Sequence, residues 1–203
     1  MKSRLHSDLV TGLFTLILAL LLPTSVQAQQ KSTIFETFQS LCGSTFTGEM
    51  TFPETGNDDF RGKLLVAKVE SCTEQKIRIP FHVGDDKSRT WILSQTEQGL
   101  LFKHDHRHDD GHEDEISNYG GYAADTEKPN KDAFNTQLSI NKDSLTQSFP
   151  ADEFTQQLIP AAATNVWSFT FNESLDQFTY HLERHNKPRF TAVLRKQKHK
   201  KSQ

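Results

Sequence analysis

The chain has 203 residues, of which 34% are hydrophobic and 24% are charged, and its formal net charge is −3. This length is sufficient for one domain with a buried core. The acidic balance argues against a nucleic-acid-binding protein, because such proteins usually present an excess of basic residues.

The N-terminal segment has the pattern of a secretory signal peptide. Lys2 and Arg4 precede an apolar run at residues 10–22. Val26 and Ala28 then occupy the small-residue positions of a cleavage site. We therefore predict a signal peptide that is cleaved near Ala28 and a periplasmic or secreted protein. No segment is long and apolar enough to span a bilayer comfortably, so we expect a soluble mature chain with no membrane span.

A short amphipathic helix and a β-hairpin are predicted next. Residues 32–41 place apolar side chains at near-helical spacing, with Ser32 at the position of an N-cap. Alternating segments at 44–52 and 63–69 flank a cluster of Pro, Gly, Asn and Asp, which is typical of a hairpin.

The chain contains two cysteines, Cys42 and Cys72, which lie just beyond the two ends of this predicted hairpin. Antiparallel pairing of the hairpin strands would bring them opposite each other. Cysteine pairs in exported proteins are usually oxidised. We therefore predict a disulfide between Cys42 and Cys72.

Further short strands follow at close spacing, separated by turn-forming residues. A second short helix is expected at residues 151–159, with Asp152 near its start. The further strands are expected at residues 76–83, 89–96, 99–106, 134–140, 165–172, 177–184 and 189–196. The core is expected to contain Phe46, Met50, Leu64, Trp91, Phe102, Trp167, Phe169 and Phe190.

This pattern of about eight to ten strands and two short helices predicts an all-β fold. The expected architecture is a single antiparallel β-barrel over residues 29–196, lipocalin-like (calycin-like) or cupin-like in shape. Residues 1–28 are the predicted signal peptide, and residues 197–203 form a basic C-terminal tail that could contact an anionic surface weakly.

The segment HDHRHDDGHEDE, at residues 104–115, follows directly on a predicted strand. Alternate residues of a strand share a face. Lys103 and Asp105 should therefore face solvent. The inward face of the barrel should carry Leu100, Phe102, His104, His106 and His108.

Imidazoles at alternate strand positions can reach one metal ion, and a carboxylate can complete the ligand set. The candidate metal ligands are His104, His106, His108, Asp110, Glu113 and Asp114. The ion would be zinc, nickel, copper or iron. The same segment is also consistent with two alternatives to a metal site. These are a hydrogen-bonded polar rim without a metal and a disordered acidic loop.

The segment Tyr119-Gly-Gly-Tyr122 is predicted to form a turn, because glycine readily adopts a positive φ angle. Such a turn would close the loop that follows the histidine cluster. Tyr119 and Tyr122 flank it and are candidate ligand-binding residues.

Part of the cluster resembles the first sequence motif of the cupins, a family of metal-binding β-barrels. The match consists of His106, His108, Glu113 and Gly120 and implies that the first three bind a metal ion. The second cupin motif is missing from the sequence. The block GLLFKHDHRHDDG, followed by YGGY, also resembles an uncharacterised group of exported bacterial proteins, which implies export but no particular activity.

Three functions are consistent with these patterns. The first is binding of a metal ion or small ligand at a histidine-rich and carboxylate-rich barrel mouth. The second is a cupin-type metal-dependent enzyme that uses one carboxylate of the cluster as a ligand or base. The third is a non-catalytic structural or interaction protein whose acidic rim contacts a partner.

Overall fold

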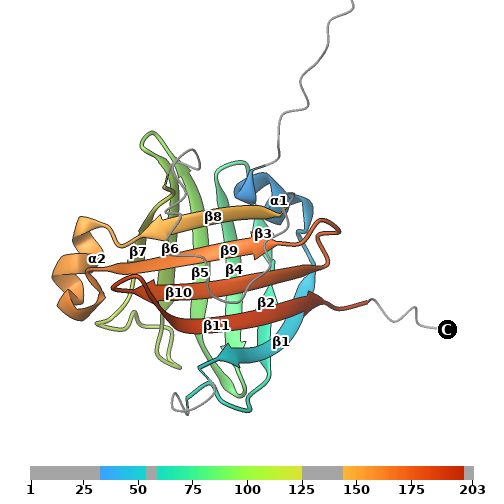
Figure 1. Ribbon diagram of the computed structural model, residues 1–203, viewed down its shortest axis with the longest axis horizontal. Helices are drawn as coiled ribbons and strands as arrows, with labels where there is room; N and C mark the ends of the chain where they lie inside the picture. Colours follow the sequence, from blue (N-terminus) through green and yellow to red (C-terminus); the bar gives the residue numbers. More distant parts are fainter. Residues whose placement is uncertain (1–32, 54–58, 125–143, 199–203) are drawn as a thin grey trace, which may run out of the picture. The chain divides into compact units, whose positions relative to one another are not determined.

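The computed structural model describes residues 33–53, 59–124 and 144–198 (Figure 1). The predicted signal peptide, the strand expected at 134–140 and most of the basic tail lie outside these residues. Within the described ranges, no helix is long and apolar enough to cross a membrane.

The fold is an antiparallel β-barrel that is nearly closed, as predicted (Figure 1). Neighbouring strands pair in the order β7-β6-β5-β4-β2-β1-β11-β10-β9-β8, and the short β3 pairs with β4 outside this path. The strands are β1 (Thr45–Phe52), β2 (Leu65–Lys68), β3 (Ser71–Cys72), β4 (Lys76–Val83), β5 (Asp86–Thr96), β6 (Gly99–His106), β7 (Tyr119–Tyr122), β8 (Leu145–Pro150), β9 (Asn165–Phe171), β10 (Gln177–Arg184) and β11 (Lys187–Lys196). The helices are α1 (Ile34–Ser40), α2 (Glu153–Leu158) and the 3-10 helix η1 (Pro160–Ala162).

Most of the predicted elements are confirmed. Strands β4 and β6 have the predicted bounds, and the last three strands form the predicted meander. Strand β5 begins earlier than expected, at Asp86. Strand β8 was not predicted, because its sequence LTQSFP alternates only weakly. The N-cap of α1 is Thr33 rather than Ser32, and Thr33 forms a capping box with Glu36.

The two edge strands, β7 and β8, lie against each other and nearly close the barrel. The Ala124 amide donates to the Ser148 carbonyl oxygen at 2.9 Å. A Cβ atom placed on Gly121 would lie 1.7 Å from the Pro150 carbonyl oxygen, so this seam requires glycine. The prediction of a turn at Tyr119–Tyr122 is therefore wrong, because the two glycines allow a strand to fit tightly between its neighbours.

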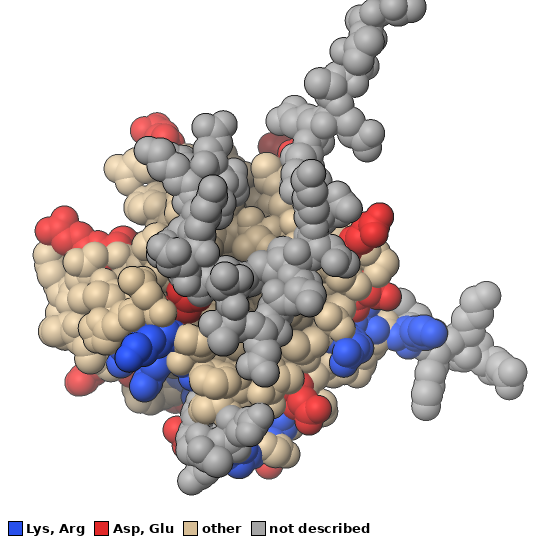
Figure 2. All heavy atoms as spheres, viewed as in Figure 1, with Lys and Arg blue, Asp and Glu red and all other residues tan. Residues whose placement is uncertain are grey.

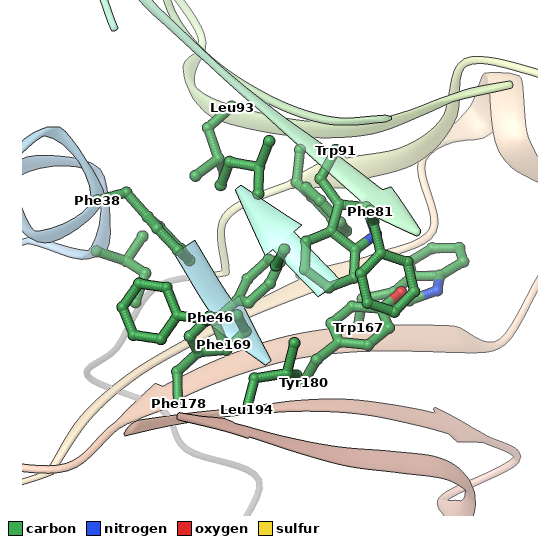
Figure 3. Close-up of a cluster of buried hydrophobic side chains, with 14 of the residues drawn as sticks. Phe38, Phe46, Phe81, Trp91, Leu93, Trp167, Phe169, Phe178, Tyr180 and Leu194 are labelled. Carbon is green, nitrogen blue, oxygen red and sulfur yellow. The ribbon is translucent and has the colours of Figure 1, made fainter. Parts of the chain in front are cut away.

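Helix α1 covers one end of the barrel with its apolar face (Figure 3). The Phe38 side chain is fully buried. Its ring meets those of Phe169, Phe171 and Phe178 edge-on, with centroid distances of 5.3, 5.0 and 5.7 Å. Edge-on contacts are favourable for aromatic rings and add to the energy of burial. The helix thus completes the core at this end of the barrel.

The predicted disulfide between Cys42 and Cys72 is confirmed, with a Cα–Cα distance of 6.2 Å. It joins the segment that follows α1 to strand β3. The sequence separation is 30 residues. A loop of this size corresponds to about 3.5 kcal/mol of stabilisation in the chain-entropy model. The bond therefore helps to hold α1 in place over the end of the barrel.

Six of the eight predicted core residues are buried, which supports the assignment of inward faces. Met50 is only half-buried, and Leu64 is 59% exposed because Leu65, the first residue of β2, takes the inward position. The confirmed core residues are Phe46, Trp91, Phe102, Trp167, Phe169 and Phe190.

Candidate functional site

A cavity of about 780 Å³ lies at the end of the barrel away from α1. Its walls are mostly aromatic and aliphatic, and four of the lining side chains, Phe81, Trp91, Trp167 and Tyr180, are labelled in Figure 3. The Trp91 ring stacks on Phe81 at a centroid distance of 4.1 Å and lies 4.5 Å from the Tyr180 ring. Trp167 lines the cavity from β9. A volume and lining of this kind are typical of sites for small organic molecules.

Strand pairing explains why these side chains face one another. Trp91 on β5 pairs with His104 on β6, and His104 pairs in turn with Tyr119 on β7. Cross-strand partners share a face of the sheet. Phe169 and Tyr180 are paired in the same way on β9 and β10, and Tyr180 also lines the cavity.

His104 is a buried polar residue of this cavity and is only 4% exposed. Its Nδ1 lies 3.1 Å from the Tyr119 carbonyl oxygen, and its Nε2 lies 2.7 Å from the Tyr180 hydroxyl. A carbonyl oxygen can only accept, so in the neutral ring Nδ1 donates to it and Nε2 accepts from Tyr180. The lone pairs of the Tyr180 hydroxyl are then left to accept a hydrogen bond from a molecule in the cavity.

The ionisable groups at the base of the cavity are neutral at physiological pH. Burial lowers the pKa of His104 to about 3, although its hydrogen bond to the Tyr119 carbonyl acts in the opposite direction. Burial also raises the pKa of Tyr119 to about 12 and that of Tyr180 well above its usual value. These residues therefore provide neutral hydrogen-bonding groups, not an ionised base or nucleophile.

Three arginines line the cavity, whereas none of its described lining residues is acidic. Arg89 forms an ion pair with Asp86. Arg184 donates from Nε to Asn165 Oδ1 at 2.8 Å. Within the described ranges, neither Arg184 nor Arg189 forms an ion pair with a carboxylate. The described residues at the cavity entrance therefore carry more positive than negative charge.

A β-bulge explains how Arg189 comes to line the cavity. In the pairing of β10 with β11, Leu182 is opposite Phe190 and Glu183 is opposite Pro188, so Arg189 is the extra residue. Bulges of this kind redirect a side chain relative to the regular alternation. Figure 2 shows Lys and Arg side chains close to the turn between β10 and β11.

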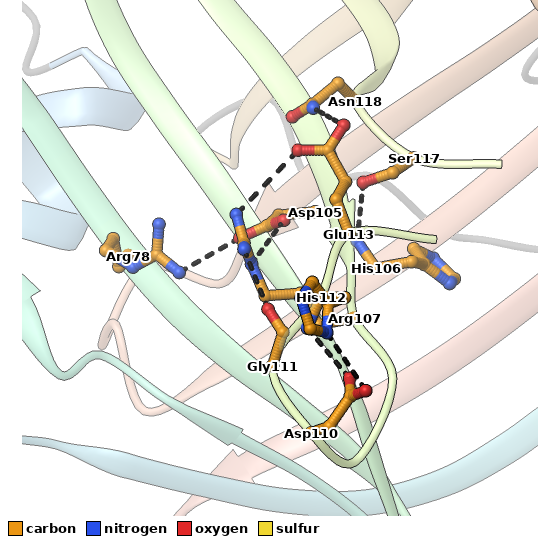
Figure 4. A network of polar contacts seen from close by, with 10 residues as sticks. All are labelled: Arg78, Asp105, His106, Arg107, Asp110, Gly111, His112, Glu113, Ser117 and Asn118. Carbon is orange, nitrogen blue, oxygen red and sulfur yellow. Dashed lines mark hydrogen bonds and ion pairs between the residues drawn. The ribbon is translucent and has the colours of Figure 1, made fainter. Parts of the chain in front are cut away.

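The acidic part of the histidine cluster forms a network on the outer side of β6 (Figure 4). Asp105 is 2% exposed and forms ion pairs with Arg78 and Arg107, each at 3.1 Å. The Arg107 guanidinium also lies 3.9 Å from the Glu113 carboxylate. This network fixes the loop after β6 against the outside of the barrel.

The predicted side-chain directions on β6 are partly confirmed. Phe102 and His104 face the interior, as expected. Asp105 does not face open solvent, because its two arginine partners cover it. Lys103 is also partly covered, since it forms an ion pair with Asp152 at 2.5 Å and lies 5.0 Å above the Phe154 ring.

The six candidate metal ligands are not assembled into one group. In the described residues, no cluster of three or more His, Cys, Asp or Glu side chains could hold a metal ion. His106 Nε2 lies 3.0 Å from the Tyr119 hydroxyl, and in Figure 4 its ring points away from the carboxylates. His108 is exposed beyond the end of β6, so it does not continue the row of inward-facing side chains on this strand. Asp110 contacts His112 Nδ1 at 2.9 Å.

The remaining predicted ligands also have local partners. Glu113 Oε1 accepts from Asn118 Nδ2 at 2.8 Å, and Asp114 Oδ1 accepts from the Ile116 amide at 2.8 Å. The residues of the cupin-like motif therefore do not converge in this structure. The metal site stays a prediction that the geometry does not support.

Of the two candidate tyrosines, Tyr119 lines the cavity and Tyr122 does not. Sequence reasoning missed Tyr180 and Arg184 as site residues. The alternation of inward and outward side chains along β10 identifies both, because it places Tyr180 and Arg184 on the same face as Phe178 and Leu182. Arg189 could not have been found in this way, because the bulge breaks the alternation.

The chain matches no protein-family model, and comparison with the curated proteins and the solved structures found no match.

Proposed function

We propose that this protein binds a small, largely apolar organic molecule in the cavity at the open end of its barrel. The observation that carries this proposal is the cavity of about 780 Å³ lined by Phe81, Trp91, Trp167 and Tyr180. Burial of apolar ligand surface against such walls supplies most of the binding energy of small-molecule sites. A few polar groups, such as the Tyr180 hydroxyl, would orient the ligand.

The proposed location of this activity is outside the cytoplasm. The disulfide between Cys42 and Cys72 is consistent with an oxidising compartment. The sequence pattern of a signal peptide supports export. Together they favour a periplasmic or secreted binding protein.

A fluorescent probe tests the proposal directly. N-phenyl-1-naphthylamine is neutral and apolar, and its emission increases when it leaves water. It should bind the wild-type protein saturably. Replacing Leu182 with Trp should weaken this binding at least about tenfold, which corresponds to a loss of about 1.4 kcal/mol in binding free energy. Leu182 lines the cavity, and the larger indole would occupy space that the probe needs.

A matched substitution controls for the added indole. Leu64→Trp introduces the same side chain at an exposed position that does not line the cavity. It should leave the affinity for the probe unchanged. Equal affinity in the wild type, Leu182→Trp and Leu64→Trp would place probe binding elsewhere and overturn the proposal.

A further inference from the structure

We infer that the natural ligand is an anionic amphiphile, an apolar body that carries a carboxylate, and that Arg184 and Arg189 bind its carboxylate. This inference rests on the proposed function and specifies its ligand. The cavity walls would receive the apolar body, and the two guanidinium groups at the entrance would receive the acidic group.

The hydrogen-bonding capacity of the two guanidinium groups supports this assignment. A guanidinium has five N–H donors. Arg184 uses its Nε–H on Asn165, and the terminal nitrogens have no protein partner within the described residues. Arg189, redirected by the bulge, has no carboxylate partner there either. Arginine matches a carboxylate with two parallel hydrogen bonds, which is its strongest common interaction.

The local charge balance points in the same direction. Arg89, the third arginine of the cavity, is already paired with Asp86. Glu183, the acidic neighbour of Arg184, lies on the other face of β10, where it is 3.4 Å from His181. Among the described residues, Arg184 and Arg189 are therefore two positive charges at the cavity entrance without a carboxylate partner, in a chain whose net charge is −3.

Two like charges at the edge of an apolar cavity repel each other. Partial burial and then the neighbouring Arg189 lower the pKa of Arg184, which is the expected direction for such a pair. A carboxylate between the two side chains would relieve this repulsion. A cationic ligand would increase it, so the entrance should discriminate by the sign of the charge.

Three ligands of equal chain length test the inference. The experiment measures how strongly decanoate, decan-1-ol and decylammonium each displace N-phenyl-1-naphthylamine at pH 7.5. Each ligand is kept at concentrations where it is monomeric in solution. Decanoate should bind the wild type at least about tenfold more tightly than decan-1-ol, and decylammonium should bind most weakly. Raising the salt concentration to about 0.5 M should weaken the binding of decanoate, because salt screens partly exposed ion pairs. The affinity for decan-1-ol should stay unchanged.

The double variant Arg184→Gln/Arg189→Gln should bind decanoate and decan-1-ol with similar affinity. Arg195→Gln removes one exposed arginine of β11 that does not line the cavity, and it should behave as wild type. The ranking of ligands and its salt dependence in the wild type need no variant, so they test the inference even where a variant folds poorly.

The outcomes separate this inference from the function on which it rests. Similar affinity for all three ligands in the wild type, or tightest binding of decylammonium, would overturn the charge assignment and leave the binding function intact. Failure of both the probe and decan-1-ol to bind would overturn the binding function itself.

Discussion

Between about pH 6 and pH 4, His104 alone should lower the free energy of unfolding by about 1.4 kcal/mol for each unit of acidification. Burial holds the folded-state pKa of His104 at about 3, against 6.5 for the free side chain. In this interval the unfolded chain binds a proton at His104 and the folded chain does not. Stability therefore falls as the pH falls from about 6.5 towards 3.

Urea unfolding of the wild type and of His104→Gln at several pH values measures this effect. Carboxylates and other histidines also titrate in this range, so the relevant quantity is the difference between the two proteins. That difference should change by several kcal/mol in total between pH 6.5 and pH 3. His108→Gln, at an exposed position beyond the end of β6, is the matched control and should follow the wild type. Parallel pH profiles for wild type and His104→Gln would show that His104 is not held neutral in the barrel.

Replacing Phe38 with Ala should lower the free energy of unfolding by about 3–5 kcal/mol. The Phe38 ring is fully buried between α1 and the barrel, where it contacts Phe169, Phe171 and Phe178. Its removal would leave a cavity that the rigid ends of the strands cannot fill. The same denaturant experiment measures the loss.

Leu64→Ala is the control for this substitution, since Leu64 is 59% exposed and should contribute less than about 0.5 kcal/mol. Because Phe38 lies at the end of the barrel away from the cavity, Phe38→Ala should retain its affinity for N-phenyl-1-naphthylamine under conditions where it is folded. A loss of stability below about 1 kcal/mol would show that α1 is not part of the cooperative core.

The barrel was predictable from the sequence because alternation of apolar and polar residues reports which face of a strand is buried. This alternation located β4, β6 and β10, and the cysteine positions located the disulfide. The strand β7 was not predictable, because two adjacent glycines are typical of turns. Their role here, close contact with neighbouring strands, depends on residues distant in the sequence, such as Pro150.

The cavity lies at the end of β6 where the sequence placed the candidate site, but the predicted metal ligands do not come together there within the described residues. His104 does line a cavity, as the alternation indicated. The carboxylates after it do not join it there, because Asp105 instead binds Arg78 and Arg107 outside the barrel. A local sequence pattern cannot show which charges from other strands lie nearby. The same reason explains why Arg184 and Arg189, far along the chain, were missed.

The indole N–H signals of the two tryptophans test the central claim most directly. Trp91 and Trp167 are the two tryptophans of the chain, and both line the cavity. In a ¹⁵N-labelled sample titrated with N-phenyl-1-naphthylamine, both indole signals should shift, and both should saturate with the affinity measured by fluorescence. The amide signals of α1, at the other end of the barrel, should stay in place. Saturable binding of the probe that leaves both indole signals unmoved would contradict the assignment of the cavity as the binding site.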